Sequence, residues 1–336
     1  MLGSPCIARS APIDPIETAA AHPACTFAIA ALQRSKLVHT ADSQACGPTS
    51  GSPGIFQAAS LSKPVVATLA LKLASRGQLD LDRSLDELLP EGYVHRQNLF
   101  DLRAAPIVDK VPRDLLQRLT TRMLLSHTSG LPNWSATSAL QLGFEPGTRW
   151  QYSGEGFVLL QHLLHTLTGK PLQELASTEL FEPLGMQDSA FKLTSRIAAS
   201  LVPGRSDSRL VHPLRFPFEI ASGSLYTSAA DYARFMSSVL ADERMISLVT
   251  QKPVPVPQVA DVFWGLGWGI EQLGGHTHIW HWGSNPGFRA LAMADLDTKD
   301  AIVVLTATEE GMPLAKSRVR ATLPGPHPAL DLPLVR

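Results

Sequence analysis

Cysteine, net charge and long apolar runs are all scarce in this chain of 336 residues. Its three cysteines, Cys6, Cys25 and Cys46, contain no Cys-x-x-Cys pair, which argues against a disulfide framework or a cysteine-based zinc site and indicates free thiols. The net charge of -1 at pH 7 gives no basic surface for nucleic acid or an anionic membrane. No apolar run is long enough to span a bilayer.

The first residues also lack a secretion signal. Residues 1–22 have few basic side chains and are interrupted by Pro5, Pro12 and Pro15, whereas a signal peptide needs a basic start and an apolar core. We therefore expect a cytoplasmic protein that acts on a small molecule, with a periplasmic or secreted location left open. The sequence indicates no oligomeric state.

Strand patterns occupy both ends of the chain, and helix patterns occupy the middle. Alternating apolar residues predict strands over 26–41, and strands joined by short turns are predicted at 263–272, 276–283, 288–295 and 301–308. Apolar residues at three- and four-residue spacing predict helices at 61–76, 114–125, 156–168 and 229–240, with a closing helix at 312–323. The fold class expected is α+β, an antiparallel sheet flanked by helices with a mostly helical inserted region.

This order of elements predicts the organisation of the chain. We expect an N-terminal extension (1–24), a sheet region built from 25–77 and 246–323, and a helical region (78–245). A ligand cleft should lie where the sheet and helical regions meet. The tail (324–336) opens with several prolines and is expected to be poorly ordered.

Ser60 and Lys63 form a Ser-x-x-Lys element where a predicted helix begins. Residues i and i+3 share a helix face, so the Ser60 hydroxyl and the Lys63 amine can meet. A serine becomes nucleophilic when a neighbour takes its proton, and burial lowers the pKa of lysine so that it can act as that base. A second such element, Ser189 and Lys192, precedes no long helix and is predicted to be structural.

Four further segments follow the first element in order: LLSHTSGL at 124–131, EPGTRWQYSG at 145–154, PLGM at 183–186 and His281-Trp282-Gly283. Together, over about residues 25–320, they resemble the serine β-lactamases, penicillin-binding proteins and related esterases of the class-C-like branch. The resemblance implies an acyl-enzyme on Ser60, with Lys63 as base and Tyr152 as a second proton-transfer group. It places the oxyanion hole at the backbone N–H groups of Ser60 and Ser284, beside His281, Gly283 and Gly154. It implies no cofactor and no metal.

Two departures from the family pattern bear on the substrate, which we expect to be a small ester or amide. Gly154 replaces the Asn of the family's Tyr-x-Asn element, and His281 replaces a Lys, so that its charge depends on pH. Both changes disfavour β-lactams and favour carboxylic esters. A D-amino-acid peptidase or amidase, a weak β-lactamase and a catalytically inactive ligand-binding member stay open as alternatives.

Three other sequence features resemble parts of a functional site. His276, His278 and His281 form a His-x-His-x-x-His run, but Trp280 stands where metallo-β-lactamase-fold enzymes have Asp, and His281 points to the other face of a strand. A metal-dependent hydrolase is therefore not expected. His127 is predicted to be a buried structural histidine. Three tryptophans, Trp268, Trp280 and Trp282, are assigned equally to an apolar pocket and to the core.

Overall fold

A computed structural model describes residues 27–43, 54–100, 105–206, 209–211, 214–216, 218–257 and 259–335. The predicted N-terminal extension and the three cysteines lie outside these residues. None of the helices in the described ranges has the length and apolar character needed to cross a membrane.

The described strands are β1 (Phe27–Gln33), β2 (Lys36–Ser43), β3 (Phe56–Ala59), β4 (Val94–Arg96), β5 (Val108–Lys110), β6 (Arg205–Ser206), β7 (Arg209–Leu210), β8 (Leu225–Thr227), β9 (Val254–Pro255), β10 (Val262–Trp264), β11 (Gly269–Leu273), β12 (His276–Asn285), β13 (Phe288–Asp295) and β14 (Ala301–Thr306). The α-helices are α2 (Ser62–Ser75), α3 (Leu85–Leu88), α4 (Arg113–Gln117), α5 (Thr121–Leu125), α6 (Gly154–Thr168), α7 (Leu172–Ala176), α8 (Ser195–Ser200), α9 (Ala229–Ala241), α10 (Glu243–Thr250) and α11 (Met312–Thr322). Short helical turns are η1 (Ser177–Phe181), η2 (Glu309–Gly311) and η3 (Pro328–Asp331).

The two ends of the chain build one antiparallel sheet, as the sequence predicts. The strand order is β2-β1-β14-β13-β12-β11-β10-β9, so the first strand pairs with the last one. Arg34 and Ser35 both have positive φ in the turn between β1 and β2, a conformation that matches the twist of a tight hairpin. The α+β fold class is confirmed.

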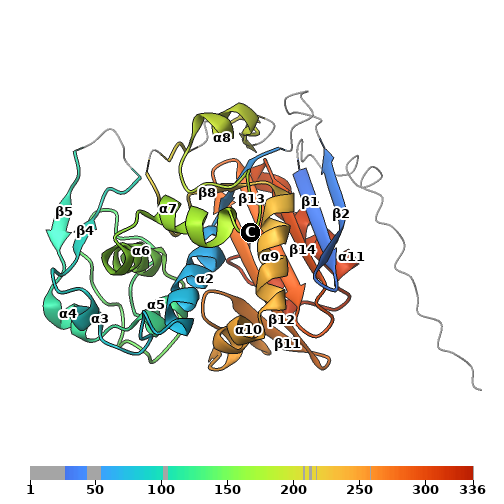
Figure 1. Ribbon diagram of the computed structural model, residues 1–336. Coiled ribbons are helices and arrows are strands. Elements are labelled where there is room, and N and C mark those ends of the chain that lie inside the picture. The colour runs from blue at the N-terminus through green and yellow to red at the C-terminus, as the bar shows by residue number, and fades with distance from the viewer. Residues whose placement is uncertain are drawn as a thin grey trace, which may run out of the picture.

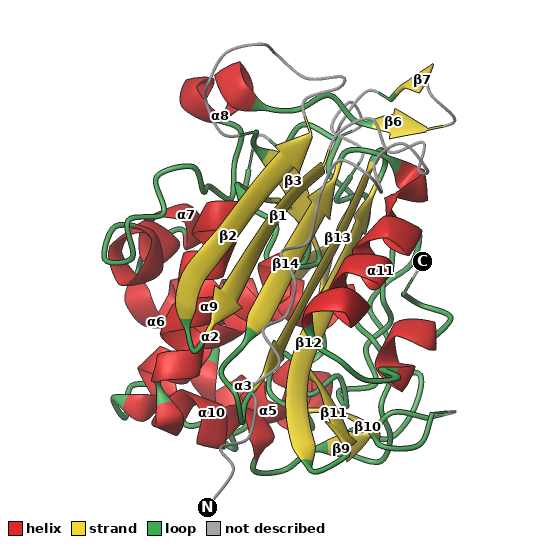
Figure 2. Cartoon of the chain, turned by 90° about the vertical axis from the view of Figure 1, so that its right-hand side faces the viewer, coloured by secondary structure: helices red, strands yellow, loops and turns green. Residues whose placement is uncertain are grey.

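Helices cover both faces of this sheet (Figure 2). α11 packs on β13 and β14 from one face, whereas α9 contacts β1, β2 and β14 from the other face, the side on which α2 also lies. Residues 229–241 therefore belong with the sheet, not with the helical region in which the sequence placed them. Helices α3 to α6 form a separate group beside the sheet (Figure 1).

Two predicted elements are each divided in the structure. The strand expected at 263–272 is interrupted after Trp264, and β11 begins at Gly269. Between them Gly267, at φ +83°, lies so close to α2 that a side chain there would clash with the Cβ of Ala67. The helix expected at 114–125 consists of α4 and α5, because Thr120 caps a new helix with its side chain.

The C-terminal tail is packed against the sheet, which corrects the prediction of a poorly ordered segment. The prolines exclude a long helix, but η3 forms, and Ala329, Leu330, Leu332 and Val335 are buried in the same hydrophobic cluster as α11. His327 is also fully buried and bonds Glu271 of β11. Apolar side chains and one buried polar contact thus hold a segment that has little regular structure.

Candidate active site

The predicted nucleophile and base meet at the start of α2. Ser60 lies in the tight turn that joins β3 to this helix, and Lys63 Nζ is 3.1 Å from Ser60 Oγ. The amine also donates a hydrogen bond of 2.8 Å to the carbonyl oxygen of Ser222. Burial of Lys63 holds its pKa well below the usual value of 10.5. The amine is therefore biased toward the neutral form that a general base requires.

Tyr152 reaches the same point from the segment that precedes α6. Lys63 Nζ lies 4.8 Å from the centre of its ring, and the hydroxyl is buried without a hydrogen-bond partner among the described residues. Burial raises the pKa of Tyr152, while its interaction with Ser60 opposes that rise. The structure therefore brings together the three residues that the sequence predicted to be catalytic.

His127 supports Tyr152 from behind. Its Nδ1 accepts a hydrogen bond of 3.1 Å from the backbone N–H of Ser153, and its ring centre lies 4.4 Å from that of Tyr152. Burial, followed by the nearby Lys63 and His281, keeps its pKa well below the usual value of 6.5. This neutral, enclosed imidazole fits the structural role predicted from the sequence.

His281 differs from expectation. It is fully buried and does not border the cavity above Ser60. Its Nδ1 bonds the carbonyl oxygen of Trp282 at 2.7 Å, and burial followed by the charge of Lys63 keeps its pKa well below 6.5. Because the imidazole is neutral at physiological pH, it supplies no cation in place of the family's lysine, and its charge is not a working pH switch.

A cavity of about 530 Å³ lies above Ser60. It is lined by Ser60, Phe100, Asn133, Trp134, Tyr152, Leu214, Phe216, Ser222, Gly223, Trp282, Ser284, Asn285, Pro286 and Leu334. None of these described residues carries a formal charge at neutral pH. Of the three tryptophans left open by the sequence, Trp282 lines the cavity, whereas Trp268 and Trp280 are buried in the core.

Gly283 brings β12 against the turn that carries the nucleophile. A side chain at this position would clash with the carbonyl oxygen of Ala58, so glycine permits the close approach. The next residue, Ser284, consequently lines the cavity together with Ser60. This is the placement that an oxyanion hole made from their two backbone N–H groups requires.

The residues of this site lie within a region of the chain that matches a known protein family. The Beta-lactamase family matches residues 28–324, a range that contains every site residue described above except Leu334. The chain belongs to the beta-lactamase family.

The chain is similar to proteins that are named as a penicillin-binding protein and as an esterase. Penicillin-binding protein 4* of Bacillus subtilis is 25% identical over 76% of this chain and 61% of its own length. Esterase EstB of Burkholderia gladioli is 31% identical over 41% of this chain and 38% of its own. The chain thus covers less than two thirds of either relative. The solved structure of the beta-lactamase/D-alanine carboxypeptidase from Pseudomonas syringae has a TM-score of 0.73 at 18% identity, covering 92% of this chain and 97% of that one.

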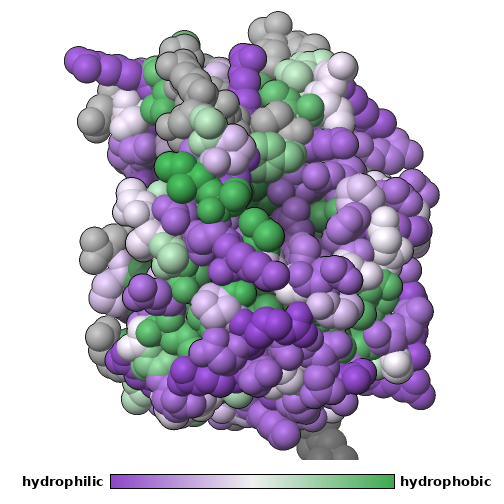
Figure 3. All heavy atoms as spheres, turned by 90° about the vertical axis from the view of Figure 1, so that its left-hand side faces the viewer, coloured by the Kyte–Doolittle hydropathy of each residue, from purple (hydrophilic) through white to green (hydrophobic). Residues whose placement is uncertain are grey.

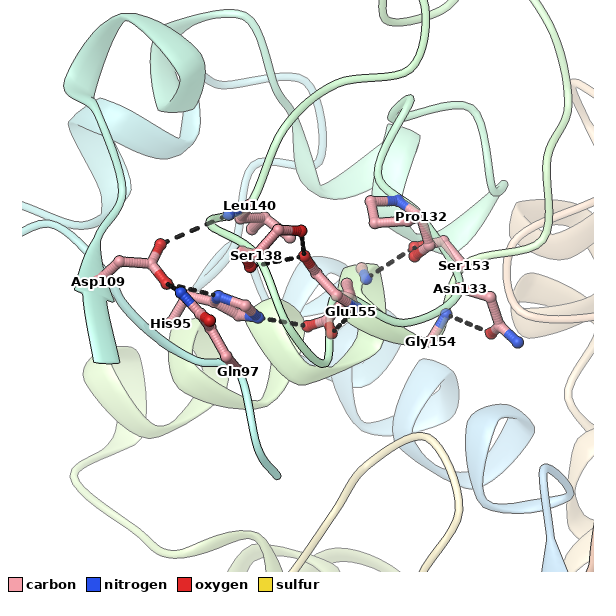
Figure 4. Close-up of polar contacts among 12 residues, drawn as sticks. His95, Gln97, Asp109, Pro132, Asn133, Ser138, Leu140, Ser153, Gly154 and Glu155 are labelled. Atoms are coloured by element: carbon pink, nitrogen blue, oxygen red, sulfur yellow. Dashed lines mark hydrogen bonds and ion pairs between the residues drawn. The ribbon is translucent and has the colours of Figure 1, made fainter. Parts of the chain in front are cut away.

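A neighbouring loop packs against Gly154, the position at which the family resemblance places an asparagine (Figure 4). A Cβ at Gly154 would lie 2.7 Å from the Asn133 backbone oxygen and 2.9 Å from the Trp134 ring. The N–H of Gly154 donates to the side-chain oxygen of Asn133 at 3.0 Å. Because that oxygen is fixed, the amide nitrogen of Asn133 points away from Gly154, and Asn133 itself lines the cavity.

A buried charge network holds this loop (Figure 4). Glu155 accepts the backbone N–H of Ser135 at 2.9 Å and lies 3.4 Å from His95 Nε2. The other nitrogen of His95 is 3.1 Å from Asp109 Oδ1, and Asp109 Oδ2 accepts the N–H of Leu140. Burial alone would lower the pKa of His95, but hydrogen bonds to both carboxylates outweigh it and raise that pKa. His95, held between two carboxylates, helps to fix both ends of the loop that carries Asn133.

The second Ser-x-x-Lys element, Ser189 and Lys192, lies among polar partners of its own. Ser189 bonds Asp231 at 3.0 Å and Lys192 lies 3.9 Å from Glu219, so the second Ser-x-x-Lys element is structural, as predicted. The carbonyl of Ser222 and the side chain of Asn133 were missed. Only Asn133 has a sequence signal, since it lies two residues after the LLSHTSGL segment.

Proposed function

We propose that the chain is a serine hydrolase that forms an acyl-enzyme on Ser60 and prefers uncharged esters. Neutral Lys63 takes the proton of the Ser60 hydroxyl as Oγ bonds to the substrate carbonyl carbon. Backbone N–H groups of Ser60 and Ser284 stabilise the oxyanion. The C–O bond to the leaving group then breaks, and that alcohol receives the proton through Tyr152. Water attacks the ester on Ser60 in the reverse sense and releases the acid.

One observation carries the preference for uncharged substrates: no charged side chain lines the cavity among the described residues. β-Lactams and peptides ending in D-alanine bear a carboxylate, and burying a carboxylate without a cationic partner is strongly unfavourable. His281 cannot be that partner, because burial keeps it neutral. A neutral ester carries no such penalty.

The walls of the cavity support an apolar acyl group. Aromatic side chains of Trp134, Phe216 and Trp282 border the space above Ser60, and Leu334 also lines it. Aromatic surfaces stabilise apolar groups by burial and by stacking. A relative within the family is named an esterase, which agrees with this proposal.

A second candidate, hydrolysis of amides such as D-amino-acid amides, is favoured by Asn133. Its side-chain oxygen is occupied by the N–H of Gly154, so its NH₂ group is free to donate toward a bound substrate. A hydrogen bond of this kind holds an amide carbonyl, the role that the sequence assigned to the missing asparagine at 154.

Labelling and matched substrates test both candidates. A serine-directed phosphonate should add one adduct to the wild-type chain and none to Ser60→Ala, and labelling of the Ser60→Ala protein would refute the nucleophile. The ratio kcat/KM should be higher for a short-chain nitrophenyl ester than for a chromogenic cephalosporin, and a preference for the cephalosporin contradicts the proposal. Loss of amide but not ester turnover in Asn133→Ala would favour the second candidate.

A further inference from the structure

A second cavity, of about 350 Å³, lies at the opposite end of β12 from Ser284. Three histidines, His276, His278 and His327, line it together with Asp295. From His278 to Ser284 the strand runs six residues, or about 20 Å, so this cavity is remote from the catalytic serine. The mechanism proposed above uses none of its side chains.

Three buried donor groups converge beside this cavity from separate parts of the chain. Glu271 of β11 stands directly opposite His278 of β12 in the sheet register, and His327 comes from the C-terminal tail. One ligand atom from each lies within 4.8 Å of the other two. Glu271 and His327 are fully buried, and His278 is 5% exposed. Such burial of one carboxylate and two imidazoles is costly unless each group has a partner.

The partners are incomplete in one place. His278 Nδ1 is buried without a hydrogen bond, and it lies 3.8 Å from Glu271 Oε1. The same oxygen of Glu271 lies 2.7 Å from His327 Nδ1. A direct ion pair between His327 and Glu271 satisfies those two groups but leaves Nδ1 of His278 unpaired. An ion bound between the three would satisfy all of them.

Two of the three donors, His327 and Glu271, are also oriented from their far side by a hydrogen bond, and the third faces a carboxylate. His327 Nε2 donates to the Leu323 carbonyl at 2.5 Å, and Glu271 Oε2 accepts the N–H of Ala329 at 3.0 Å. His278 Nε2 faces Asp295 Oδ2 at 3.9 Å. Carbonyls and carboxylates behind imidazoles, and a hydrogen bond to the ligating carboxylate, are the usual outer shell of metal ligands.

We propose that Glu271, His278 and His327 form a binding site for a divalent transition-metal ion such as Zn²⁺. Two imidazoles and one carboxylate are a zinc ligand set, and water from the adjoining cavity completes four-coordination. His327 Nδ1 releases its proton on binding, so the ion takes the place of the proton now shared with Glu271. The sequence predicted no metal ligands, and this proposal revises that prediction for Glu271, His278 and His327. The three residues come together only in the folded chain.

The ion fastens the C-terminal tail to the sheet. His327 is the tail's only ligand in this set, and its φ of +44° is unfavourable for a residue with a side chain, so strong contacts must hold it there. Beyond it, Leu334 lines the cavity above Ser60. Metal binding is therefore linked to the order of the tail and to one wall of the substrate cavity, without taking part in the proposed acyl transfer.

Metal content and stability of the full chain, purified without an affinity tag, provide the test. We expect about one zinc per chain, a lower unfolding temperature after chelation and dialysis, and recovery when zinc chloride is added. His278→Ala should bind zinc at least about tenfold more weakly. It keeps the His327–Glu271 ion pair and should therefore fold. His165→Ala, which removes an exposed histidine of α6, is the matched control and should behave like the wild type.

Two outcomes would overturn the site. If dialysed wild-type protein shows neither stoichiometric zinc binding by calorimetry nor a zinc-dependent rise in unfolding temperature, the ion pair alone holds the tail. Zinc bound equally well by His278→Ala would place the ion elsewhere. Wild-type calorimetry decides the first point even if the variant does not fold. Phosphonate labelling of Ser60, run in parallel, keeps this result separate from the proposed function.

Discussion

Gly154 provides a sharp test of the loop that stands in for the missing asparagine side chain. Because the family resemblance places an Asn at position 154, the sequence alone predicts that Gly154→Asn restores an amide and narrows the gap between ester and β-lactam turnover. The structure predicts the opposite, because the space is taken by the Asn133 backbone and the Trp134 ring, 2.7 and 2.9 Å from a new Cβ.

The loss of stability expected for a side chain at position 154 depends on which of its two neighbours, Asn133 or Trp134, can move. The Asn133 backbone oxygen accepts hydrogen bonds of 3.1 Å from both Gly154 and Glu155, so it is held in place. The Trp134 ring is 38% exposed and can be displaced. Overpacking of this kind costs about 1–3 kcal/mol. We therefore expect Gly154→Ala to lose about that much free energy of unfolding and, because Trp134 and Asn133 shift, about tenfold or more in kcat/KM.

Urea unfolding and ester kinetics measure both quantities. Gly143→Ala is the matched control, since its Cβ would meet no atom closer than 3.7 Å. It should change neither stability nor kcat/KM appreciably. If Gly154→Ala is as stable as the control, or if Gly154→Asn gains activity toward a cephalosporin, the packing argument is wrong and the expectation from the sequence is restored.

Three further predictions concern the catalytic groups. Lys63→Ala and Tyr152→Phe should each lose about as much kcat as the double variant, because groups that act as a unit are non-additive; losses that add would indicate independent roles. Lys63→Met should raise the free energy of unfolding at pH 7. The folded chain holds the lysine pKa below the unfolded value, so the unfolded state binds more protons and the gain should shrink as pH rises toward 10.5; a gain independent of pH would contradict this. A chelator should leave phosphonate labelling of Ser60 intact, even if it removes an ion near His278, and loss of labelling with rescue by zinc would revive a metal-dependent mechanism.

Local signals account for the parts of the site that the sequence predicts well. Ser60 and Lys63 are three residues apart where one helix begins, so their meeting needs no knowledge of the rest of the fold. β12, β13 and β14 are neighbours in the chain and in the sheet, and short turns fix their order. The catalytic role of Tyr152 was implied by the family resemblance, since nothing in its own spacing places it beside Lys63.

The parts that could not be predicted depend on contacts between distant segments. His281 has the sequence context of a substrate-binding residue, but its position behind Tyr152 and Trp282 makes it neutral and inaccessible. Asn133 and Gly154 are 21 residues apart and meet only through a loop that His95 and Asp109 help to hold. Periodicity and composition contain no information about such pairings. The prolines of residues 324–336 led to the wrong prediction of a poorly ordered tail.

The position of Lys63 leads to a last prediction about substrate charge. A carboxylate bound over Ser60 would stand close to Lys63, whose Nζ is 3.1 Å from Oγ, and no Lys or Arg among the described cavity residues would offset it. An anion nearby raises the pKa of a lysine, and a protonated Lys63 cannot accept the Ser60 proton. Nitrophenyl succinate, an anion, should therefore have a kcat/KM at least about tenfold below that of the neutral nitrophenyl butyrate, an energy difference of about 1.4 kcal/mol. The gap should narrow at higher pH, where Lys63 is again neutral. Equal kcat/KM for the two esters at neutral and at higher pH would show that the charge of the substrate does not affect the protonation of Lys63.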